Sequence, residues 1–380
     1  MQVLRRLTLT CGAALALGSL AALPAAAQQE LPIAIMNATS GVFAFGGVPI
    51  QNGMRLALEE ANQKGMPGGA RIRIIEGDEA ADKAQAISLA TQFGRRDRAL
   101  MIMGPTNSFS ALAAGPVANE LEVPMFAIGS SNAILATGPW AFKVQAQAVD
   151  IMGFLAKYVA EKSGIKKIAL VFDQGSDGII EQKNAFRDAV KAGGVSIVSE
   201  NGIVTSESNF LALATKIASQ DIDAVYVGAP PEITANLAIQ MRQAGVPSKV
   251  RIVGPSSLAS TKYIQTGGSA VEGSLIIADY SVNSTNALNA DFVKAYKARY
   301  KNEVPDNWAA MGYTLAQIGV QAIRNAGPNP DRAKIRAEME KINNVPVVIG
   351  QGMWVKDKER RPTYGGVMLT VKKGELAILP

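Results

Sequence analysis

Short apolar runs alternate along the chain with segments whose apolar residues recur at helical spacing. In the first part of the chain, the predicted strands and helices are, in order, 31–36, 50–63, 71–75, 80–93, 99–103, 110–121 and 124–128. Short buried runs that alternate with amphipathic helices are typical of βα units. The pattern therefore predicts a largely parallel sheet with helices on both faces.

The same alternation restarts after Val149. The helices predicted in this second part are 151–161, 178–192, 210–219, 232–244, 287–300, 309–325 and 330–342. The strands predicted there are 167–172, 195–199, 224–227, 250–253 and 274–278, with a hairpin-like pattern over 350–379. No low-complexity linker separates the two parts, and 380 residues exceed one typical core. Two lobes with a cleft between them are expected, with ligand bound beyond the carboxyl ends of the strands.

The first 27 residues have the pattern of a cleaved signal peptide. Arg5 and Arg6 precede an apolar run from Leu7 to Leu23, and Ala25 and Ala27 form a small-residue cleavage site. A membrane anchor is the alternative, but the run is short and no stop-transfer pattern follows it. We expect cleavage near Ala27 and export to the periplasm.

The composition argues against several kinds of catalytic and metal-binding site. The chain has no histidine, and its one cysteine, Cys11, lies in the predicted signal. Catalysis by Ser-His-Asp or Cys-His groups, an intramolecular disulfide and a zinc site are therefore not expected. The net charge of +6 is spread over scattered residues, which does not favour nucleic-acid binding. A phosphate loop, a nucleophile elbow and a Rossmann glycine fingerprint are also absent, so we expect neither an enzyme nor a cofactor.

Several short motifs occur together in a specific order. They are Thr39-Ser40-Gly41, Phe45-Gly46, Asn52 to Ala57, Gly104 to Ser108, Val123 to Phe126, Asp173 to Gly178, Asp223 to Tyr226, Pro231-Glu232, Gln243 to Gly245, Ala309 to Leu315 and Gly350 to Asp357. In this order the chain resembles the leucine/isoleucine/valine-binding protein family, the type I periplasmic binding proteins of amino-acid ABC importers.

The resemblance implies two Rossmann-like lobes joined by three hinge crossovers near Val144, Asp279 and Gly350. Lobe 1 would comprise 28–144 and 279–349, and lobe 2 would comprise 145–278 and 350–380. A monomer of this kind would close on an amino acid or similar small carboxylate and deliver it to an ABC permease in the inner membrane. The same fold also serves ligand sensors, and the sequence does not separate sensing from transport.

Ser108 is the first candidate ligand-binding residue. It follows a predicted strand and precedes a helix, where it would be a good N-cap beside N–H groups that favour a carboxylate. A cap without a ligand is the alternative. The resemblance implies that this serine holds the ligand's carboxylate.

Ser130, Ser131 and Asn132 follow the strand 124–128. A polar turn is the plain interpretation of this cluster. The resemblance implies that one of its members gives a hydroxyl and a carbonyl to the ligand, without deciding which.

Two acids begin helices in the second part. Glu232 would stabilise the helix dipole, or, as the resemblance implies, pair with the ligand's ammonium across the cleft. Asp177 stands where the family often has tyrosine, so it either caps the next helix or favours a more polar or cationic ligand. An acid pair such as Asp177 and Glu232 could in principle catalyse hydrolysis of a bound compound, but a carboxylate pair alone is weak support for an enzyme.

Phe45, Tyr280 and Trp308 stand where the resemblance places apolar pocket walls. Core packing is the alternative, and it is about as good for Tyr280 as a role in the pocket. With Phe43 nearby, the pocket would also suit a flat ligand such as an aromatic or keto acid.

Overall fold

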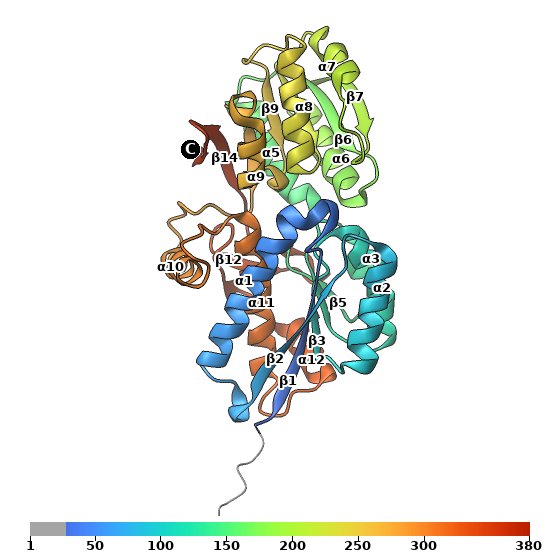
Figure 1. Cartoon of the computed structure of the whole chain (residues 1–380), viewed down its shortest axis with the longest axis vertical. Coiled ribbons are helices and arrows are strands. Elements are labelled where there is room, and N and C mark those ends of the chain that lie inside the picture. Colours follow the sequence, from blue (N-terminus) through green and yellow to red (C-terminus); the bar gives the residue numbers. More distant parts are fainter. Residues whose placement is uncertain (1–27) are drawn as a thin grey trace, which may run out of the picture.

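The computed structural model describes residues 28–380, and the predicted signal peptide lies outside the described residues. The described chain forms two α/β lobes, which lie one above the other in Figure 1. One lobe is built on a sheet of five strands and the other on a sheet of seven, and a small sheet of three strands accompanies them. The predicted α/β class with largely parallel sheets is confirmed.

The first lobe holds a parallel sheet with the strand order β2-β1-β3-β4-β5. Its strands are β1 (Glu30–Asn37), β2 (Arg71–Asp78), β3 (Met101–Met103), β4 (Met125–Ala127) and β5 (Ala141–Lys143). The accompanying helices are α1 (Ala44–Gln63), α2 (Lys83–Thr91), α3 (Ser108–Glu120), α4 (Ala133–Ala136), α10 (Asn289–Arg299), α11 (Asn307–Asn325) and α12 (Arg332–Lys341).

Strand β1 shows why this sheet is covered on both faces. Successive side chains of a strand point to opposite faces. Ile33 and Ile35 belong to the core that includes α1 and α11, whereas Ala34 and Met36 belong to the core that includes α2 and α3. Helices lie on either side of the sheet in Figure 1. Because both faces of this strand are buried, its sequence must be an unbroken apolar run without alternating polar residues.

The second lobe holds a sheet with the order β15-β14-β10-β9-β8-β6-β7. Its strands are β6 (Lys167–Asp173), β7 (Ser196–Ile203), β8 (Ala224–Gly228), β9 (Arg251–Gly254), β10 (Leu275–Ala278), β14 (Val367–Lys372) and β15 (Glu375–Ile378). Its helices are α5 (Ala148–Lys162), α6 (Asp177–Ala192), α7 (Leu211–Ala218), α8 (Pro231–Gln243) and α9 (Thr261–Gly267). The strands from β6 to β10 are parallel, and the hairpin β14-β15 adds to β10 in the antiparallel sense.

The chain passes between the two large sheets three times, at 144–147 after β5, at 279–288 after β10, and at 364–366 before β14. The small sheet precedes the third passage and consists of β11 (Val345–Pro346), β12 (Met353–Lys356) and β13 (Pro362–Thr363).

This small sheet packs on the first lobe. The indole N–H of Trp354 donates to the carbonyl oxygen of Val144 at 3.0 Å, and its ring meets the ring of Phe126 edge-on at 6.4 Å. Arg360 donates to the carbonyl oxygen of Ala141 at 2.9 Å. We therefore propose that the third lobe boundary lies at 364–366 and not near Gly350. The hairpin-like sequence pattern runs on without interruption across this boundary, so it gives no sign of the change of lobe.

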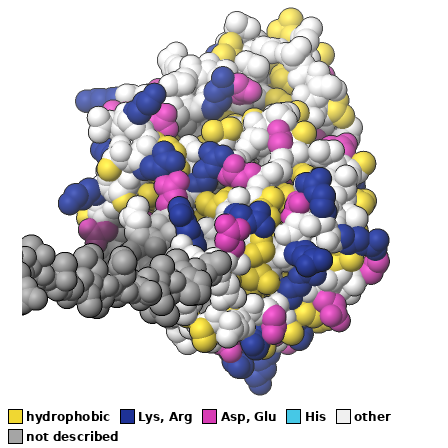
Figure 2. Space-filling model, turned by 60° about the horizontal axis from the view of Figure 1, so that its bottom comes forward, with side chains coloured by type: hydrophobic (Ala, Val, Ile, Leu, Met, Phe, Trp, Pro, Cys, Tyr) yellow, Lys and Arg dark blue, Asp and Glu magenta, His cyan; other side chains and the backbone are white. Residues whose placement is uncertain are grey.

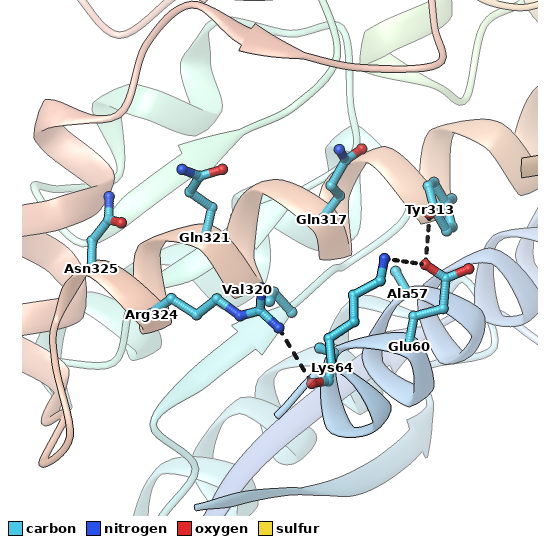
Figure 3. A pocket seen from close by; sticks show the side chains of 10 residues that line it. Ala57, Glu60, Lys64, Tyr313, Gln317, Val320, Gln321, Arg324 and Asn325 are labelled. Carbon is cyan, nitrogen blue, oxygen red and sulfur yellow. Dashed lines mark hydrogen bonds and ion pairs between the residues drawn. The ribbon is translucent and has the colours of Figure 1, made fainter. Parts of the chain in front are cut away.

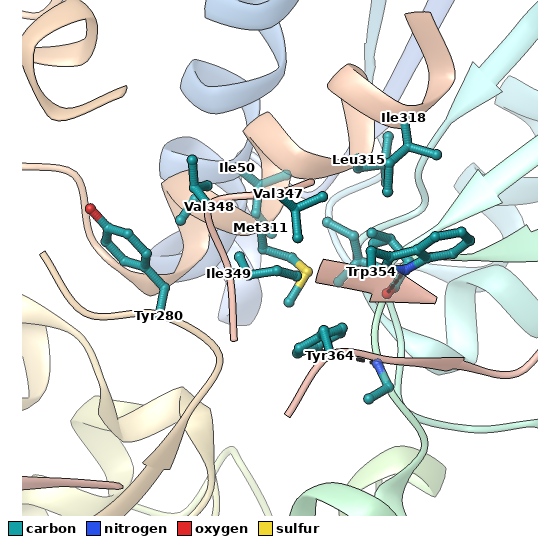
Figure 4. Close-up of a cluster of buried hydrophobic side chains, with 14 of the residues drawn as sticks. Ile50, Tyr280, Met311, Leu315, Ile318, Val347, Val348, Ile349, Trp354 and Tyr364 are labelled. Carbon is teal, nitrogen blue, oxygen red and sulfur yellow. Dashed lines mark hydrogen bonds between the residues drawn. The ribbon is translucent and has the colours of Figure 1, made fainter. Parts of the chain in front are cut away.

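The three passages meet at one buried carboxyl group. Tyr364 donates its hydroxyl to Asp279 Oδ1 at 2.6 Å and accepts the backbone N–H of Ala146 at 3.2 Å. Asn307 at the start of α11 reaches the second oxygen of Asp279 at 3.4 Å. Burial raises the pKa of Asp279, and these hydrogen bonds act against the rise. Figure 4 shows Tyr364 beside the apolar cluster that fills the junction.

The surface drawn in Figure 2 carries lysine and arginine side chains among aspartates and glutamates, with small apolar areas between them. Between residues 28 and 380, no helix combines the length and the apolar character needed to cross a membrane.

Candidate ligand-binding site

A cavity of about 70 Å³ lies between the lobes. The residues that line it follow the carboxyl ends of strands or begin the next helices, and they are Phe43, Phe45, Thr106, Asn107, Ser108, Gly129, Ser130, Gln145, Ser176, Gly178, Ile179, Gln182, Ser256, Ser257 and Trp308. This is the position where open α/β sheets bind ligands. This volume is smaller than that of typical ligand pockets, about 300–1,000 Å³.

Helix α3 brings its N-terminus to the cavity from the first lobe. The N-cap is Asn107, whose side chain accepts the N–H of Ser110 at 2.8 Å. Ser108 is the first helical residue and not the cap that the sequence predicts, since the asparagine immediately before it takes that place. Ser108 nevertheless lines the cavity, and its hydroxyl accepts the N–H of Ser131 at 3.4 Å.

The predicted polar cluster after β4 divides in the structure. Ser130 lines the cavity, and its hydroxyl accepts the side-chain N–H of Gln182 from the second lobe at 3.0 Å. Ser131 is buried, and its hydroxyl oxygen accepts the backbone N–H of Ala133 at 3.3 Å. Asn132 donates to Gln147 at 2.7 Å. Neither Ser131 nor Asn132 lines the cavity.

Helix α6 brings a second N-terminus to the cavity, from the opposite lobe. Ser176 and Gly178 line the cavity beside Ser108 and Ser130. A Cβ atom on Gly178 would lie 2.9 Å from the hydroxyl oxygen of Ser108 and 3.5 Å from that of Ser130. The lobes thus come into close contact at a position where the second lobe has no side chain.

Three aromatic rings form one wall. The rings of Phe43 and Phe45 stack at 6.0 Å, and Trp308 stands edge-on to Phe45 at 6.0 Å. All three line the cavity. Two of the predicted apolar residues, Phe45 and Trp308, are therefore brought together.

Tyr280 lies elsewhere. Its side chain is 2 % exposed, and its hydroxyl donates to Asn289 at 2.7 Å. It borders a separate groove with Asp306 and Leu376, and packs in the junction cluster of Figure 4. The geometry of Tyr280 therefore favours core packing over a place in the pocket wall.

The two candidate acids are not in the cavity. Asp177 is exposed at the start of α6. The side chain of Glu232 is 53 % exposed and pairs with Lys262 at 2.7 Å. In this geometry Glu232 has no part in the cavity, so the hypothesis that it binds a ligand ammonium gains no support. A helix start fixes where an acid lies along the chain but not whether its side chain turns toward the cleft.

Charged groups lie behind the uncharged lining. Glu79 is fully buried and accepts hydrogen bonds from Asn107 at 2.9 Å and from Ser110 at 2.7 Å. Burial raises the pKa of Glu79 to about 7. Lys143 at the end of β5 is 1 % exposed and donates to the carbonyl oxygen of Ser130 at 2.8 Å. The cavity is therefore neutral at its surface and has titratable groups in the layer beneath.

A larger groove on the first lobe lies between α1 and α11 (Figure 3). Glu60 in this groove accepts from Lys64 at 3.3 Å and from Tyr313 at 3.0 Å, and Arg324 donates to the carbonyl oxygen of Gly65 at 3.1 Å. We consider the smaller cavity between the lobes to be the functional site, because it lies beyond the carboxyl ends of the strands and receives the N-termini of α3 and α6. Within residues 28–380, no group of three or more acids, histidines or cysteines is placed to hold a metal ion.

Several lining residues could not be selected from the sequence. Gln145, Gln182 and Ser256 come from three separate segments, and each is an ordinary polar residue in its local pattern. Thr106 and Asn107 lie in the same strand-end segment as Ser108. Their position directly after β3 is the one sequence signal by which they could have been selected as candidate lining residues.

Comparisons with known proteins identify the family and the fold. The model of a family described as periplasmic binding protein matches residues 30–375. The Leu/Ile/Val-binding protein of Escherichia coli K12 is 27 % identical over 333 residues, which cover 87 % of this chain and 88 % of the relative. The Leu/Ile/Val-binding protein BraC3 of Rhizobium johnstonii is 24 % identical over 363 residues, with 92 % of each chain covered.

Solved structures show the same fold. The branched-chain amino acid transporter substrate-binding protein LivJ of Streptococcus pneumoniae, in complex with isoleucine, superposes with a TM-score of 0.84 at 23 % identity, covering 92 % of this chain and 99 % of the other. A solute-binding protein of an ABC transporter from R. palustris, in complex with benzoate, gives a TM-score of 0.82 at 22 % identity, with 92 % and 95 % covered. The two-lobe fold expected from the sequence is thereby confirmed.

Proposed function

The chain belongs to the periplasmic binding protein family, and on that premise we propose that it is the substrate-binding protein of an ABC importer. It captures a small carboxylate, an amino acid or a similar compound, in the cleft between its lobes and delivers it to the membrane permease. The relatives named above as Leu/Ile/Val-binding proteins support this proposal over most of the chain's length.

One observation carries the proposal for an anionic ligand. The N-termini of α3 and α6 reach the cavity from opposite lobes, and Ser108, the first residue of α3, lines it together with Ser130. The first N–H groups of a helix have no partner within the helix, and the helix dipole adds partial positive charge there. A carboxylate held between two such ends would join the lobes in the closed form.

A second candidate ligand class rests on the lining itself. An α-amino acid brings an ammonium group, and none of the side chains lining the described cavity is acidic. Phe43, Phe45 and Trp308 instead offer an apolar aromatic wall, in which Trp308 stands edge-on to Phe45. An aromatic acid without an ammonium group matches both features.

The cellular setting follows from the same proposal. The protein would be exported, lose residues 1–27 near Ala27, act as a monomer in the periplasm and dock on an inner-membrane permease. A ligand sensor of the same fold would present its closed form to a signalling receptor instead. Permease and ATPase genes beside this gene would favour transport, and a signalling kinase gene would favour sensing.

A thermal-shift screen tests the proposal. The mature chain from Gln28 is unfolded and refolded to remove carried-over ligand, then heated with leucine, isoleucine, benzoate, keto acids and their amides. A ligand at about a hundred times its Kd adds about 2.7 kcal/mol and raises the melting temperature. A rise with an acid but not with its amide would support the carboxylate site. No rise with any acid would contradict the proposed function.

A further inference from the structure

Lys143 is a buried ammonium group without a carboxylate partner. It ends β5 with 1 % of its surface exposed, and the carbonyl oxygen of Ser130 is its hydrogen-bond acceptor at 2.8 Å. None of the ion pairs in the part of the chain that the structure describes includes it. An ammonium group buried against one neutral oxygen is costly, because the charge has lost its water.

Ser130 connects this ammonium group to the cavity. Its backbone carbonyl holds Lys143, while its hydroxyl receives Gln182 from the other lobe, and the residue lines the cavity beside Ser108. Ser130 is therefore the residue that separates the ammonium group of Lys143 from the cavity, on the side where the N-termini of α3 and α6 reach it. Low-dielectric surroundings make that charge act strongly on whatever the cavity holds.

We propose that Lys143, acting through Ser130, is the counter-charge for the ligand's carboxylate and makes the cavity select acids that lack an ammonium group. This inference rests on the proposed function and adds the ligand class. A bound carboxylate would supply the negatively charged partner that Lys143 lacks within the described chain. A zwitterion would bring its ammonium group into a cavity with uncharged walls, a buried lysine and the positive ends of two helices. The wall of Phe43, Phe45 and Trp308 then favours an aromatic acid.

Other titratable groups lie around Lys143. Glu181 on α6 and Asp150 on α5 act on it from a distance, and burial outweighs them, lowering the pKa of Lys143 to about 7. Glu79 behind Asn107 and Asp279 at the junction are buried carboxyl groups whose pKa values are raised. A bound anion would raise the pKa of Lys143 and also that of Glu79.

The sign of the linkage follows from these shifts. Ligand binding would take up protons near neutral pH, so affinity for an acid should be high below pH 7 and fall as the pH rises above it. Titration calorimetry with benzoate at pH 6 and pH 9 should show a fall in affinity of about tenfold or more in the wild type. Benzamide, the uncharged amide, should bind with the same weak affinity at both.

Variants assign the effect to Lys143. Lys143→Met should weaken benzoate binding about tenfold to a hundredfold at pH 6 and leave benzamide binding unchanged. Lys143→Arg keeps the charge at all these pH values, so it should bind benzoate and lose most of the pH dependence. In Glu79→Gln the affinity for benzoate should still depend on pH, whereas in Lys143→Arg most of that dependence should be lost.

A matched control is Lys183, which is also buried but already pairs with Glu200 at 3.0 Å. Lys183→Met should leave the ratio of benzoate to benzamide affinity unchanged. If Lys143→Met does not fold, Lys143→Arg alone decides, because an unchanged pH profile in that variant would overturn the inference. Leucine binding without benzoate binding would also overturn it while leaving the proposed function intact, and binding of neither acid would remove both.

Discussion

Gly178 in the second lobe faces Ser108 in the first across the cavity, so closely that a Cβ atom on the glycine would lie 2.9 Å from the serine hydroxyl oxygen. Ser108 is the first residue of α3 and Gly178 the second of α6, the helices whose N-termini meet at the site. The close approach of the lobes at this point therefore depends on an absent side chain as much as on the polar groups around it.

Replacing Gly178 with alanine should hinder closure without unfolding either lobe. The added methyl group must displace the Ser108 side chain or hold the lobes apart, so affinity for the best ligand of the screen should fall about tenfold or more. Calorimetry measures the affinity, and X-ray scattering measures the compaction on binding. Gly153→Ala is the control, because no heavy atom lies within 4 Å of its added Cβ atom. Equal affinities in the two variants would contradict this account of closure.

Ser108→Ala removes a hydroxyl at the proposed carboxylate position. We expect carboxylate binding to weaken by about 1–3 kcal/mol, the cost of leaving a buried polar group unpaired. Ser131→Ala is the matched control, since that serine is buried nearby but turns its hydroxyl away to Ala133. Isothermal titration of both variants should separate them, and equal losses would place the carboxylate elsewhere.

Glu232→Gln should leave binding almost unchanged. The side chain is half exposed and already paired with Lys262, and it does not line the cavity. We expect affinities for leucine and for benzoate within about threefold of the wild type, since exposed ion pairs contribute little. A selective loss of leucine binding would restore Glu232 as an ammonium partner and would imply that α8 moves into the cleft.

Glu79 should make the free energy of unfolding depend on pH. Its pKa is about 7 in the folded protein, against an ordinary value of 4.5, so the folded form retains a proton that the unfolded form releases. Its stabilising contribution is complete below pH 4.5 and is lost as the pH rises through 7, by about 3 kcal/mol in all. Urea denaturation of the wild type and Glu79→Gln between pH 4.5 and 8 should show the difference between them changing by that amount. A constant difference would show that Glu79 titrates normally.

Tyr364→Phe removes one hydroxyl that serves two chain passages. The N–H of Ala146 and the carboxyl group of Asp279 would each lose a partner, which should lower the free energy of unfolding by about 1–3 kcal/mol. Tyr158→Phe is the control, because that hydroxyl has no hydrogen bond within the part of the chain described here. Denaturant titration gives the stability of both variants, and equal values would mean that Asp279 finds another donor.

Much of the fold could be predicted from the sequence because it depends on local pattern. The unbroken apolar run of β1 requires cover on both faces, and Ile33 and Ala34 indeed pack in different cores. Ser108 and Ser130 could be selected for a similar reason, since residues that follow parallel strands reach the same edge of a sheet.

The rest depends on side-chain direction and on distant contacts, neither of which a pattern contains. Asn107 takes the cap expected of Ser108, a shift of one position within the same turn. Glu232 begins a helix as expected but turns to Lys262 on the outside. Tyr364 and Asp279 lie 85 positions apart, and nothing in either neighbourhood indicates the other.

The two ends of the described chain belong to different lobes. Strand β1 starts the first lobe, and β15 ends the second, where the carbonyl of Pro380 lies 3.5 Å from Lys162. A mechanical load applied between the two ends would therefore act across the cleft and the three chain segments that connect the lobes, and not along a single lobe. Ligand held between α3 and α6 would resist that load, so the force needed to part the lobes would report occupancy one molecule at a time.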